Sequence, residues 1–432
     1  MESAPTKEAS VKPIGESLKP IALAEVAVKL ALNAKFGRKG DQVAVRFEAD
    51  TVVLHEDDFA IAERAALRIR SKIPRQVSPG ALITLVGEAQ KAVGEEIFRP
   101  GAVRVLYYAT LSKASAFYRC LMPMYALNMG GRAVAHASNT RFGREALDYD
   151  VVVLQIDNSP SALEFMLSLQ KRGKKVVYEI DDAFDCLEPW HPQYASYGQP
   201  ARIEAVKAMI AQADAVQVST PWLAARYADV AKQIHVVPNM VELAAWPRAD
   251  RLRRDGRWKV LWAGSPSHSG DLDVVIPALG AFARAHRDVV ITFFGQAVKD
   301  DRIPADQVET IDWCELEEYP FTLAKVDADI AIAPLVDVPF NRGKSNLRIL
   351  QYWATGYPVI ASEVGSYKES ITLGSDGLFA GSTESWLGAL EMTYKNGPVC
   401  KKLTDAGFES VKAFDVLANS KGIEEFYASL KR

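Results

Sequence analysis

Two cations at helical spacing follow a predicted strand, where they could bind an anion. Lys344 and Arg348 are four residues apart and Gln351 comes three residues later, so a helix beginning near Lys344 would carry all three on one face. A helix start exposes unpaired backbone N–H groups and a partial positive charge, both of which favour phosphate. The preceding strand, residues 328–335, ends at the edge where open α/β sheets bind ligands. We therefore predict an anion site and favour it over a solvated cationic face.

A turn of small residues could approach the same anion. Residues 264–271, GSPSHSGD, join a predicted strand to a predicted helix, and glycine and serine allow a backbone to come close to a ligand. Gly264, Ser267 and His268 are the candidate residues. For Ser267 alone, an ordinary tight turn is an equally good interpretation.

Acidic, aromatic and basic candidates fall in the first half of the chain. Asp181 and Asp182 end the predicted strand KVVYEI, and paired acids can hold Mg²⁺, act as a general base, or cap the next segment. Arg119 could reach a phosphate or an acceptor, whereas its neighbour Tyr118 is equally suited to packing. His191 lies in EPWHPQY, a loop rich in Trp and Pro that could shape an acceptor site.

Two series of βα units are expected to position these residues. Short β-branched runs alternate with amphipathic stretches, which is typical of doubly wound parallel sheets. The first series of predicted strands is 104–110, 132–138, 150–156, 175–180, 215–220 and 234–239, and the second is 259–264, 288–295, 308–313, 328–335, 357–362 and 376–380. The charged stretch 244–258 between them predicts a linker. We expect an α/β protein with two Rossmann-like domains that face a cleft.

Length and the N-terminal pattern refine this division. A chain of 432 residues exceeds the size at which one core stops growing. We predict a flexible tail at 1–40, an accessory αβ extension at 41–100 with a hairpin at 42–54 and a helix at 57–73, an N-terminal domain at 101–245, a C-terminal domain at 256–415 and a final helical segment at 416–432. The extension has no functional interpretation beyond stabilisation, oligomer contact or partner docking.

Composition excludes several classes of protein. A net charge of −3 disfavours bulk polyanion binding, and no run of eighteen apolar residues offers a membrane span. The four cysteines lack C-x-x-C spacing, so we expect no zinc site, no disulfide framework and a cytoplasmic location. Neither G-x-G-x-x-G nor G-x-x-x-x-G-K-[ST] occurs after a predicted strand, which argues against NAD or ATP chemistry.

Several stretches together resemble GT-B fold glycosyltransferases of the GT4-like type. They are WAGSPSHSGDLDVVIPAL (262–279), ITFFG (291–295), PLVDVPFNRGKSNLRILQYWATGYPVIAS (334–362), FYRC (117–120), YEIDDAFDCL (178–187), ADAVQVSTPWLAARY (213–227) and HVVPNMVE (235–242). The resemblance covers about three-quarters of the chain. It is specific for fold and donor class, and it does not specify the sugar or the acceptor.

The chain departs from this family at a pair of glutamates. The family places them eight positions apart, and the matching residues here are Gly343 and Gln351, so both acids are missing. An amide at Gln351 can still hydrogen-bond ribose hydroxyls. Lys344, Ser345 and Asn346 are expected to supply donor contacts in place of the acid missing at Gly343.

The resemblance implies transfer of a sugar, with retention of configuration, from a UDP- or GDP-sugar to an acceptor hydroxyl. No cofactor and no metal ion would be required. Lys344, Arg348 and His268 would stabilise the leaving diphosphate. Asp182 would deprotonate the acceptor, and Asp181, His191, Tyr118 and Arg119 would bind it.

The acceptor stays open among a glycan, a lipid-linked glycan, a protein and a modified nucleic-acid base, with surface polysaccharide synthesis as the default. Peripheral membrane association and the oligomeric state are also open. Two alternative functions are kept because the family acids are missing. One is a non-catalytic nucleotide-sugar binding or scaffold protein, and the other is a GT-B sugar-nucleotide epimerase.

Overall fold

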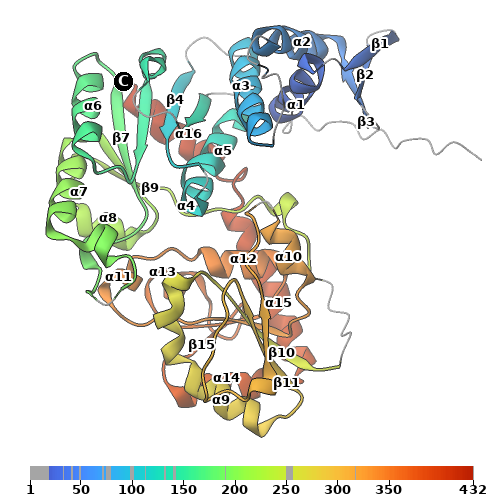
Figure 1. The fold of residues 1–432 in the computed structure, drawn as a ribbon, viewed down its shortest axis with the longest axis vertical. Coiled ribbons are helices and arrows are strands. Elements are labelled where there is room, and N and C mark those ends of the chain that lie inside the picture. Colours follow the sequence, from blue (N-terminus) through green and yellow to red (C-terminus); the bar gives the residue numbers. More distant parts are fainter. Residues whose placement is uncertain are drawn as a thin grey trace, which may run out of the picture. The chain divides into compact units, whose positions relative to one another are not determined.

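Three β-sheets form the framework of the part of the chain that the structure describes (Figure 1). The structure is a computed structural model, and it describes residues 19–32, 34–39, 42–47, 50–70, 73, 79–97, 102–111, 113–130, 133–139, 143–189, 191–249, 256–316 and 318–431. The chain divides into two units. The first comprises residues 1–109, 123–153 and 420–432, and the second comprises residues 110–122 and 154–419.

The sheet of the second unit's C-terminal half has the strand order β12-β11-β10-β13-β14-β15. Its strands are β10 (Trp258–Ala263), β11 (Val289–Phe294), β12 (Val308–Ile311), β13 (Ile330–Ala333), β14 (Val359–Ala361) and β15 (Leu378–Phe379). All five pairings are parallel. The order reverses between β10 and β13, and such a switch point opens a crevice at the carboxyl ends of the strands. The residues that follow β10 and β13 are therefore brought together.

A second six-stranded sheet has the order β5-β4-β6-β7-β8-β9. Its strands are β4 (Val103–Tyr108), β5 (Ala133–Ser138), β6 (Val151–Gln155), β7 (Lys175–Ile180), β8 (Ala215–Val218) and β9 (Ile234–Val236). The pairings of β4 with β5, of β7 with β8 and of β8 with β9 are parallel. Two six-stranded sheets confirm the predicted α/β fold class, and each strand coincides with a predicted one.

Helices alternate with these strands along the chain. They are α4 (Ala114–Ala116), α5 (Met122–Gly130), α6 (Pro160–Gln170), α7 (Pro200–Gln212), α8 (Pro221–Tyr227), α9 (Ile276–Ala285), α10 (Tyr319–Lys325), α11 (Pro339–Arg342), α12 (Leu347–Thr355), α13 (Gly365–Ser370), α14 (Thr383–Thr393), α15 (Gly397–Val411) and α16 (Ser420–Leu430). Among the described residues, none of the helices combines the length and apolar character needed to cross a membrane.

Alternate side chains of the β10 sheet point to its two faces, as the pleat requires. Val260, Trp262 and Ile332 belong to a cluster with helices α9 and α14. Leu261 and Ala333 belong to the opposite cluster, which contains α12. Strands buried on both faces are typical of parallel sheets covered by helices, which explains why the sequence shows continuous apolar runs rather than alternation.

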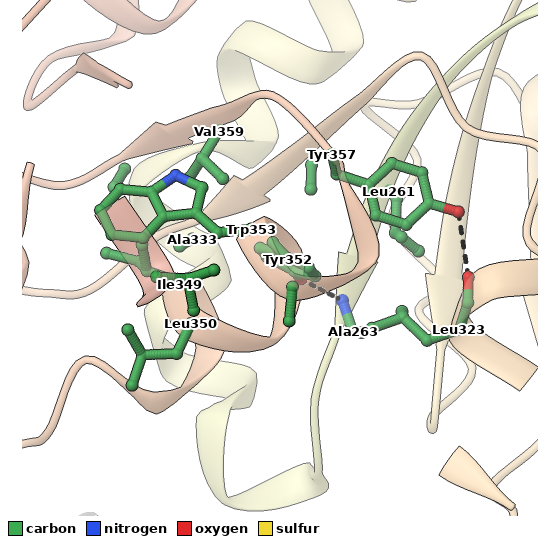
Figure 2. Packing of buried hydrophobic residues seen from close by; sticks show 14 of the residues in the cluster. Leu261, Ala263, Leu323, Ala333, Ile349, Leu350, Tyr352, Trp353, Tyr357 and Val359 are labelled. Carbon is green, nitrogen blue, oxygen red and sulfur yellow. Dashed lines mark hydrogen bonds between the residues drawn. The ribbon is translucent and has the colours of Figure 1, made fainter. Parts of the chain in front are cut away.

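Helix α12 is fixed firmly to the sheet, as Figure 2 shows. The backbone N–H of Ala263 on β10 donates a hydrogen bond to the Tyr352 hydroxyl at 2.8 Å, and Tyr357 donates to the Leu323 carbonyl at 3.0 Å (Figure 2). The indole of Trp353 donates to the Asp376 carbonyl at 3.0 Å. Gly356, at φ +91°, ends the helix in the left-handed conformation that glycine favours. These contacts give α12 one defined position relative to β10.

The N-terminal extension has its own hydrophobic core. It contains α1 (Lys19–Ala31), α2 (Glu56–Arg70), α3 (Pro79–Ile97) and an antiparallel sheet of β1 (Lys35–Lys39), β2 (Gln42–Phe47) and β3 (Asp50–His55). The predicted hairpin corresponds to β2 and β3, and the predicted helix to α2. The prediction of a flexible tail over 1–40 is wrong for residues 19–31, because α1 buries Leu23, Val26 and Ala27 in this core. Residues 1–18 lie outside the described residues.

The last helix, α16, belongs to the same unit as β4. The Tyr107 hydroxyl on β4 donates a hydrogen bond to the Tyr427 hydroxyl at 2.9 Å, and both rings are buried in edge-to-face contact. Lys431 forms an ion pair with Asp150 at 3.0 Å. Part of the predicted linker, residues 250–255, lies outside the described residues.

Candidate functional site

A pocket of about 250 Å³ lies within the second unit. Its walls come from residues 114–119, from the ends of β7 and β9, from the segments after β10 and β12, and from the start of α12. Nine of the predicted site residues line it: Tyr118, Arg119, Asp181, Asp182, Gly264, Lys344, Ser345, Arg348 and Gln351. Most of this pocket could therefore be predicted from the sequence, although its lining residues are spread from Ala114 to Tyr367 in the chain.

Arg348 places a buried guanidinium at the pocket wall. Arg348 is the second residue of α12, and only 9% of it is exposed. Its Nη1 atom has no hydrogen-bond partner among the described residues, and its guanidinium lies 5.6 Å from the centre of the Trp262 ring. A buried charge without a partner is costly, so this atom is well suited to bind an anion that enters the pocket.

Gly264 is required by the packing around this guanidinium. A Cβ atom at this position would lie 2.6 Å from the Trp262 ring and 2.9 Å from Nη2 of Arg348. The glycine therefore allows the strand end, the indole and the guanidinium to approach one another closely. This is the structural reason for the small-residue turn that the sequence shows after β10.

Lys344 supplies the second cation, but not from the helix predicted for it. The helix of the predicted anion site begins at Leu347, with Asn346 as its N-cap, and Lys344 lies in the short connection after α11. The prediction that one helical face carries both cations is therefore wrong. Gly343 is the C-cap of α11, and the polar residues Ser345 and Asn346 favour capping over helix continuation. Lys344 therefore lies outside the helix that carries Arg348.

The ammonium of Lys344 is already paired. Its Nζ atom lies 3.2 and 3.4 Å from the two carboxylate oxygens of Asp182, and 4.4 Å from the centre of the Phe340 ring. The side chains of Lys344 and Asp182 remain 17% and 21% exposed. Both groups can therefore be reached from the pocket.

Arg119 forms a buried ion pair beside the pocket. It lies in a π-helical turn (Phe117–Leu121), has no exposed surface, and donates from Nε to Glu179 at 2.6 Å. Its Nη1 donates to the Val237 carbonyl at 2.6 Å and to the Asn239 side chain at 3.0 Å. Arg119 is fully buried, yet it lines the pocket and its Nη2 atom has no hydrogen-bond partner among the described residues, so its predicted contact with phosphate or acceptor stays a prediction.

Asn239 connects this buried ion pair to the pocket wall. Its amide nitrogen donates to the Ser345 hydroxyl at 2.7 Å, while its amide oxygen accepts from Arg119. Ser345 is thereby held in one orientation at the pocket. Asn239 follows β9 by three residues, and this position near a strand carboxyl end is the signal in the sequence that could have identified it.

Gln351 is held by two tyrosines. Its amide nitrogen donates to the Tyr118 hydroxyl at 2.9 Å, and its amide oxygen is 3.5 Å from the Tyr319 hydroxyl, a weak contact. Burial raises the pKa of Tyr118 to about 12, and the hydrogen bond from Gln351 opposes this shift. Tyr118 is thus a neutral hydroxyl at the pocket wall. Tyr319, which the sequence analysis did not single out, contributes to the same wall.

Asp181 and Asp182 leave β7 and enter the pocket wall, as predicted from the end of the strand. Burial, the largest cause, and the charges of Glu179 and Asp182 raise the pKa of Asp181, while Arg119 and Lys344 lower it, and the net result is a pKa of about 8. Near neutral pH this carboxyl is therefore largely protonated and can donate a hydrogen bond. In the part of the chain that the structure describes, no three His, Cys, Asp or Glu side chains are grouped to hold a metal ion.

The raised pKa of Asp181 predicts a pH-dependent stability. Between its ordinary value of 3.8 and about 8, the folded protein binds a proton that the unfolded chain has lost, so the free energy of unfolding falls as the pH rises. The slope from this group is up to about 1.4 kcal/mol per pH unit in that window. Asp181→Asn should flatten the slope and stabilise the protein near pH 8, measured by urea unfolding at several pH values. An unchanged slope in the variant, with exposed Asp301→Asn as control, would contradict it.

Two predicted residues, Gly343 and Asn346, are absent from the lining of the pocket. A Cβ atom at Gly343 would be 3.2 Å from both Ala183 and the Trp222 ring, so this position is packed. Asn346 is 5% exposed and donates to the Ser370 hydroxyl at 2.8 Å, a structural contact. The predictions of donor contacts from these two side-chain positions are therefore corrected.

His191 lies outside the lining of the pocket. The His191 ring lies 4.8 Å from the Phe340 ring and lines a different, water-sized cavity with Asp271, so its predicted place in an acceptor site with Asp181 is corrected. Ser267 and His268 fall within the 3-10 helix Pro266–Val274. Their side chains lie outside the described residues, and their proposed contacts with the diphosphate stay predictions.

An exposed aromatic completes the pocket. Trp313, which follows β12, lines the pocket and is 56% exposed. Gly295, at φ +101°, lies beneath it, and a Cβ atom there would be 2.9 Å from the indole. The sequence indicated Trp313 only as a core or wall residue, and the structure identifies it as wall.

The comparisons of the whole chain with known proteins add to this geometry. No protein family model matches the chain. Among curated proteins, a glycogen synthase of Mycobacterium tuberculosis is 26% identical over 153 residues, which are 34% of this chain and 36% of that protein. The chain thus spans about a third of the length of the curated relatives it matches.

Solved structures match over a larger part of the chain. A sucrose-phosphate synthase from Thermosynechococcus elongatus superposes with a TM-score of 0.57 at 15% identity, covering 76% of this chain and 99% of that one. The chain has the GT-B fold. Anabaena Alr3699/HepE, solved in complex with UDP-glucose, gives a GT-B match with a TM-score of 0.55 at 15% identity over 76% of this chain and all of that one. A glycosyltransferase from Rickettsia africae gives 0.51 at 13% identity, covering 76% and 98%.

Proposed function

We propose that the protein is a glycosyltransferase that moves a sugar from a nucleoside diphosphate sugar to an acceptor hydroxyl. The observation that carries this proposal is the buried guanidinium of Arg348, whose Nη1 atom lacks a partner at the wall of a pocket about 250 Å³ in volume. Lys344 lines the same pocket. Two cations suit a diphosphate, because the guanidinium fork and the ammonium can each bind a phosphoryl oxygen.

The proposed reaction assigns a role to each pocket residue. The bond between the anomeric carbon and the diphosphate breaks, and its electron pair leaves with the nucleoside diphosphate. Arg348 and Lys344 stabilise the charge that develops on the leaving oxygens. The acceptor oxygen forms the new bond to the same carbon and gives its proton to Asp182, with retention of configuration. Ser345 and Gln351 offer a hydroxyl and an amide to the donor.

Three findings support this proposal besides the cations. The GT-B fold is shared with a sucrose-phosphate synthase and with HepE, whose structures include complexes with UDP and UDP-glucose. The partial sequence relative is a glycogen synthase. UDP- and GDP-sugars are both candidate donors, and the UDP complexes make a UDP-sugar the first to test. The cytoplasmic location and the acceptor classes stay as the sequence analysis predicted them.

A second candidate function is nucleotide-sugar binding without transfer. The packing of Gly343 against Trp222 and Ala183 favours it, because no carboxylate replaces the family's first acid at that position. Gln351 is an amide fixed by hydrogen bonds to tyrosines. An epimerase that acts on the donor alone would also be compatible with a pocket of this kind.

A donor panel separates these functions. The protein is mixed with UDP- and GDP-sugars, with and without a mixture of acceptor glycans and lipid-linked glycans, and the products are analysed by mass spectrometry. We expect release of nucleoside diphosphate that depends on the acceptor. Isomerised donor would instead indicate an epimerase. Calorimetric binding without turnover would indicate a scaffold, and the absence of binding to any nucleotide would contradict all three.

A further inference from the structure

Arg348 and Lys344, two of the cationic residues that line the pocket, differ in their hydrogen-bond partners. Nη1 of Arg348 has no hydrogen-bond partner, whereas the ammonium of Lys344 lies between the two carboxylate oxygens of Asp182 at 3.2 and 3.4 Å. Arg348 belongs to a helix fixed to the sheet. Lys344 belongs to the connection between α11 and α12, and its side chain is 17% exposed toward the pocket. In the described part of the chain, Arg348 therefore has an atom without a hydrogen-bond partner, whereas Lys344 is paired with a carboxylate of the same chain.

A diphosphate that binds Arg348 must compete with Asp182 for Lys344. An ammonium is a compact point charge, and its attraction to one anion weakens when a second anion takes the better position. A diphosphate carries more negative charge than one carboxylate. Asp182 is 21% exposed, so its carboxylate can be solvated once the ammonium has moved. Contact with water therefore lowers the free-energy cost of separating the carboxylate from the ammonium.

We propose that Asp182 is an internal counter-ion of Lys344 that is exchanged for the donor diphosphate. This inference rests on the proposed function. In the donor-free protein Asp182 neutralises Lys344, and the arrival of the donor transfers the ammonium from the carboxylate to a phosphoryl oxygen. The carboxylate, which follows Asp181 at the end of β7, is then released at the pocket wall. A base for the acceptor becomes available only after the donor has bound.

This exchange sets the order of substrate binding. Before the donor binds, both carboxylate oxygens of Asp182 are occupied by the Lys344 ammonium, at 3.2 and 3.4 Å, and are not open to an acceptor hydroxyl. After the donor binds, the same carboxylate no longer contacts the ammonium and can accept from the acceptor hydroxyl. The donor must therefore bind first, and water or acceptor that enters early meets an occupied carboxylate. Asp182 acts here as a positioning residue for Lys344 as well as in its proposed role in proton transfer.

The test is calorimetric titration of the full chain with UDP and with GDP. In Asp182→Asn the internal competitor is removed while the shape is kept, so the better of the two nucleotides should bind about fivefold more tightly than to the wild type, a gain in keeping with a partly exposed ion pair. Removing a negative charge near the pocket would also help any anion. The same substitution is therefore made in a Lys344→Met background, where the gain should disappear.

A second carboxylate provides the control. Asp337→Asn removes a carboxylate from an exposed ion pair with Arg342 and should leave nucleotide affinity unchanged. Equal or weaker binding by Asp182→Asn, or the same gain with and without Lys344, would overturn the exchange. If the wild type binds neither nucleotide, the proposed function fails instead. Thermal unfolding of each variant shows whether its fold is intact.

Discussion

Arg348→Met is expected to lower the affinity for UDP or GDP about 100-fold while the protein stays folded. The guanidinium at this position is buried, and Nη1 has no partner within the described protein. Hydrogen bonds to charged groups contribute about 1.5 to 3 kcal/mol, a range of about 10- to 150-fold in affinity, and a bidentate contact with phosphate belongs to its upper part. Methionine fills much of the same volume beside Trp262, so the packing is kept. The measurement is isothermal titration calorimetry.

The matched control for this prediction is Arg342→Met. Arg342 is the last residue of α11 and forms an exposed ion pair with Asp337, so its loss should leave nucleotide affinity close to that of the wild type. The melting temperature of Arg348→Met should be equal to that of the wild type or higher, because a buried charge without a partner is removed. Unchanged affinity in a well-folded Arg348→Met protein would show that the diphosphate binds elsewhere.

Arg119→Met is expected to destabilise the protein by about 3 to 5 kcal/mol. The substitution leaves the Glu179 carboxylate buried without its cation, and it also removes the hydrogen bonds to the Val237 carbonyl and to Asn239. Burial already raises the pKa of Glu179 and the charge of Arg119 opposes that shift, so the loss of Arg119 should raise this pKa further. Urea unfolding at pH 7 measures the loss.

A double variant distinguishes a broken ion pair from lost packing. Arg119→Met combined with Glu179→Gln removes both charges and should recover a large part of the stability, because the penalty arises from the carboxylate left behind. The exposed pair of Lys412 and Glu409 provides the control, and Glu409→Gln should leave the urea midpoint close to that of the wild type. A double variant no more stable than Arg119→Met would contradict the electrostatic explanation.

Much of the fold could be predicted, because the burial of a strand is visible in the strand's own sequence. Strands buried on both faces appear as apolar runs, so the two six-stranded sheets could be predicted from the sequence alone. Residues at strand carboxyl ends, such as Asp182 and Gly264, could be assigned to a common pocket for the same reason. The helix α1 was missed because its neighbourhood is rich in Pro, Ser and Lys, although its own residues have an apolar face.

The roles of individual side chains were less predictable, because they depend on partners distant in sequence. Arg119 has the type and position of a phosphate ligand, but Glu179, sixty residues later, binds it internally. Asn346 was a candidate ligand, yet its partner is Ser370. Lys344 was assigned to a helix that in fact starts three residues later, and it still reaches the pocket. Spacing along one element cannot reveal such pairings.

The packing at Gly343 constrains how this sequence can change. Its backbone carbonyl accepts a hydrogen bond from Thr220 at 3.2 Å, and its missing side chain would meet Ala183 and Trp222. An acidic residue at this position would need room that the indole of Trp222 now fills. A side chain at position 343 therefore requires a smaller residue at position 222 as well, so these two positions can change only together.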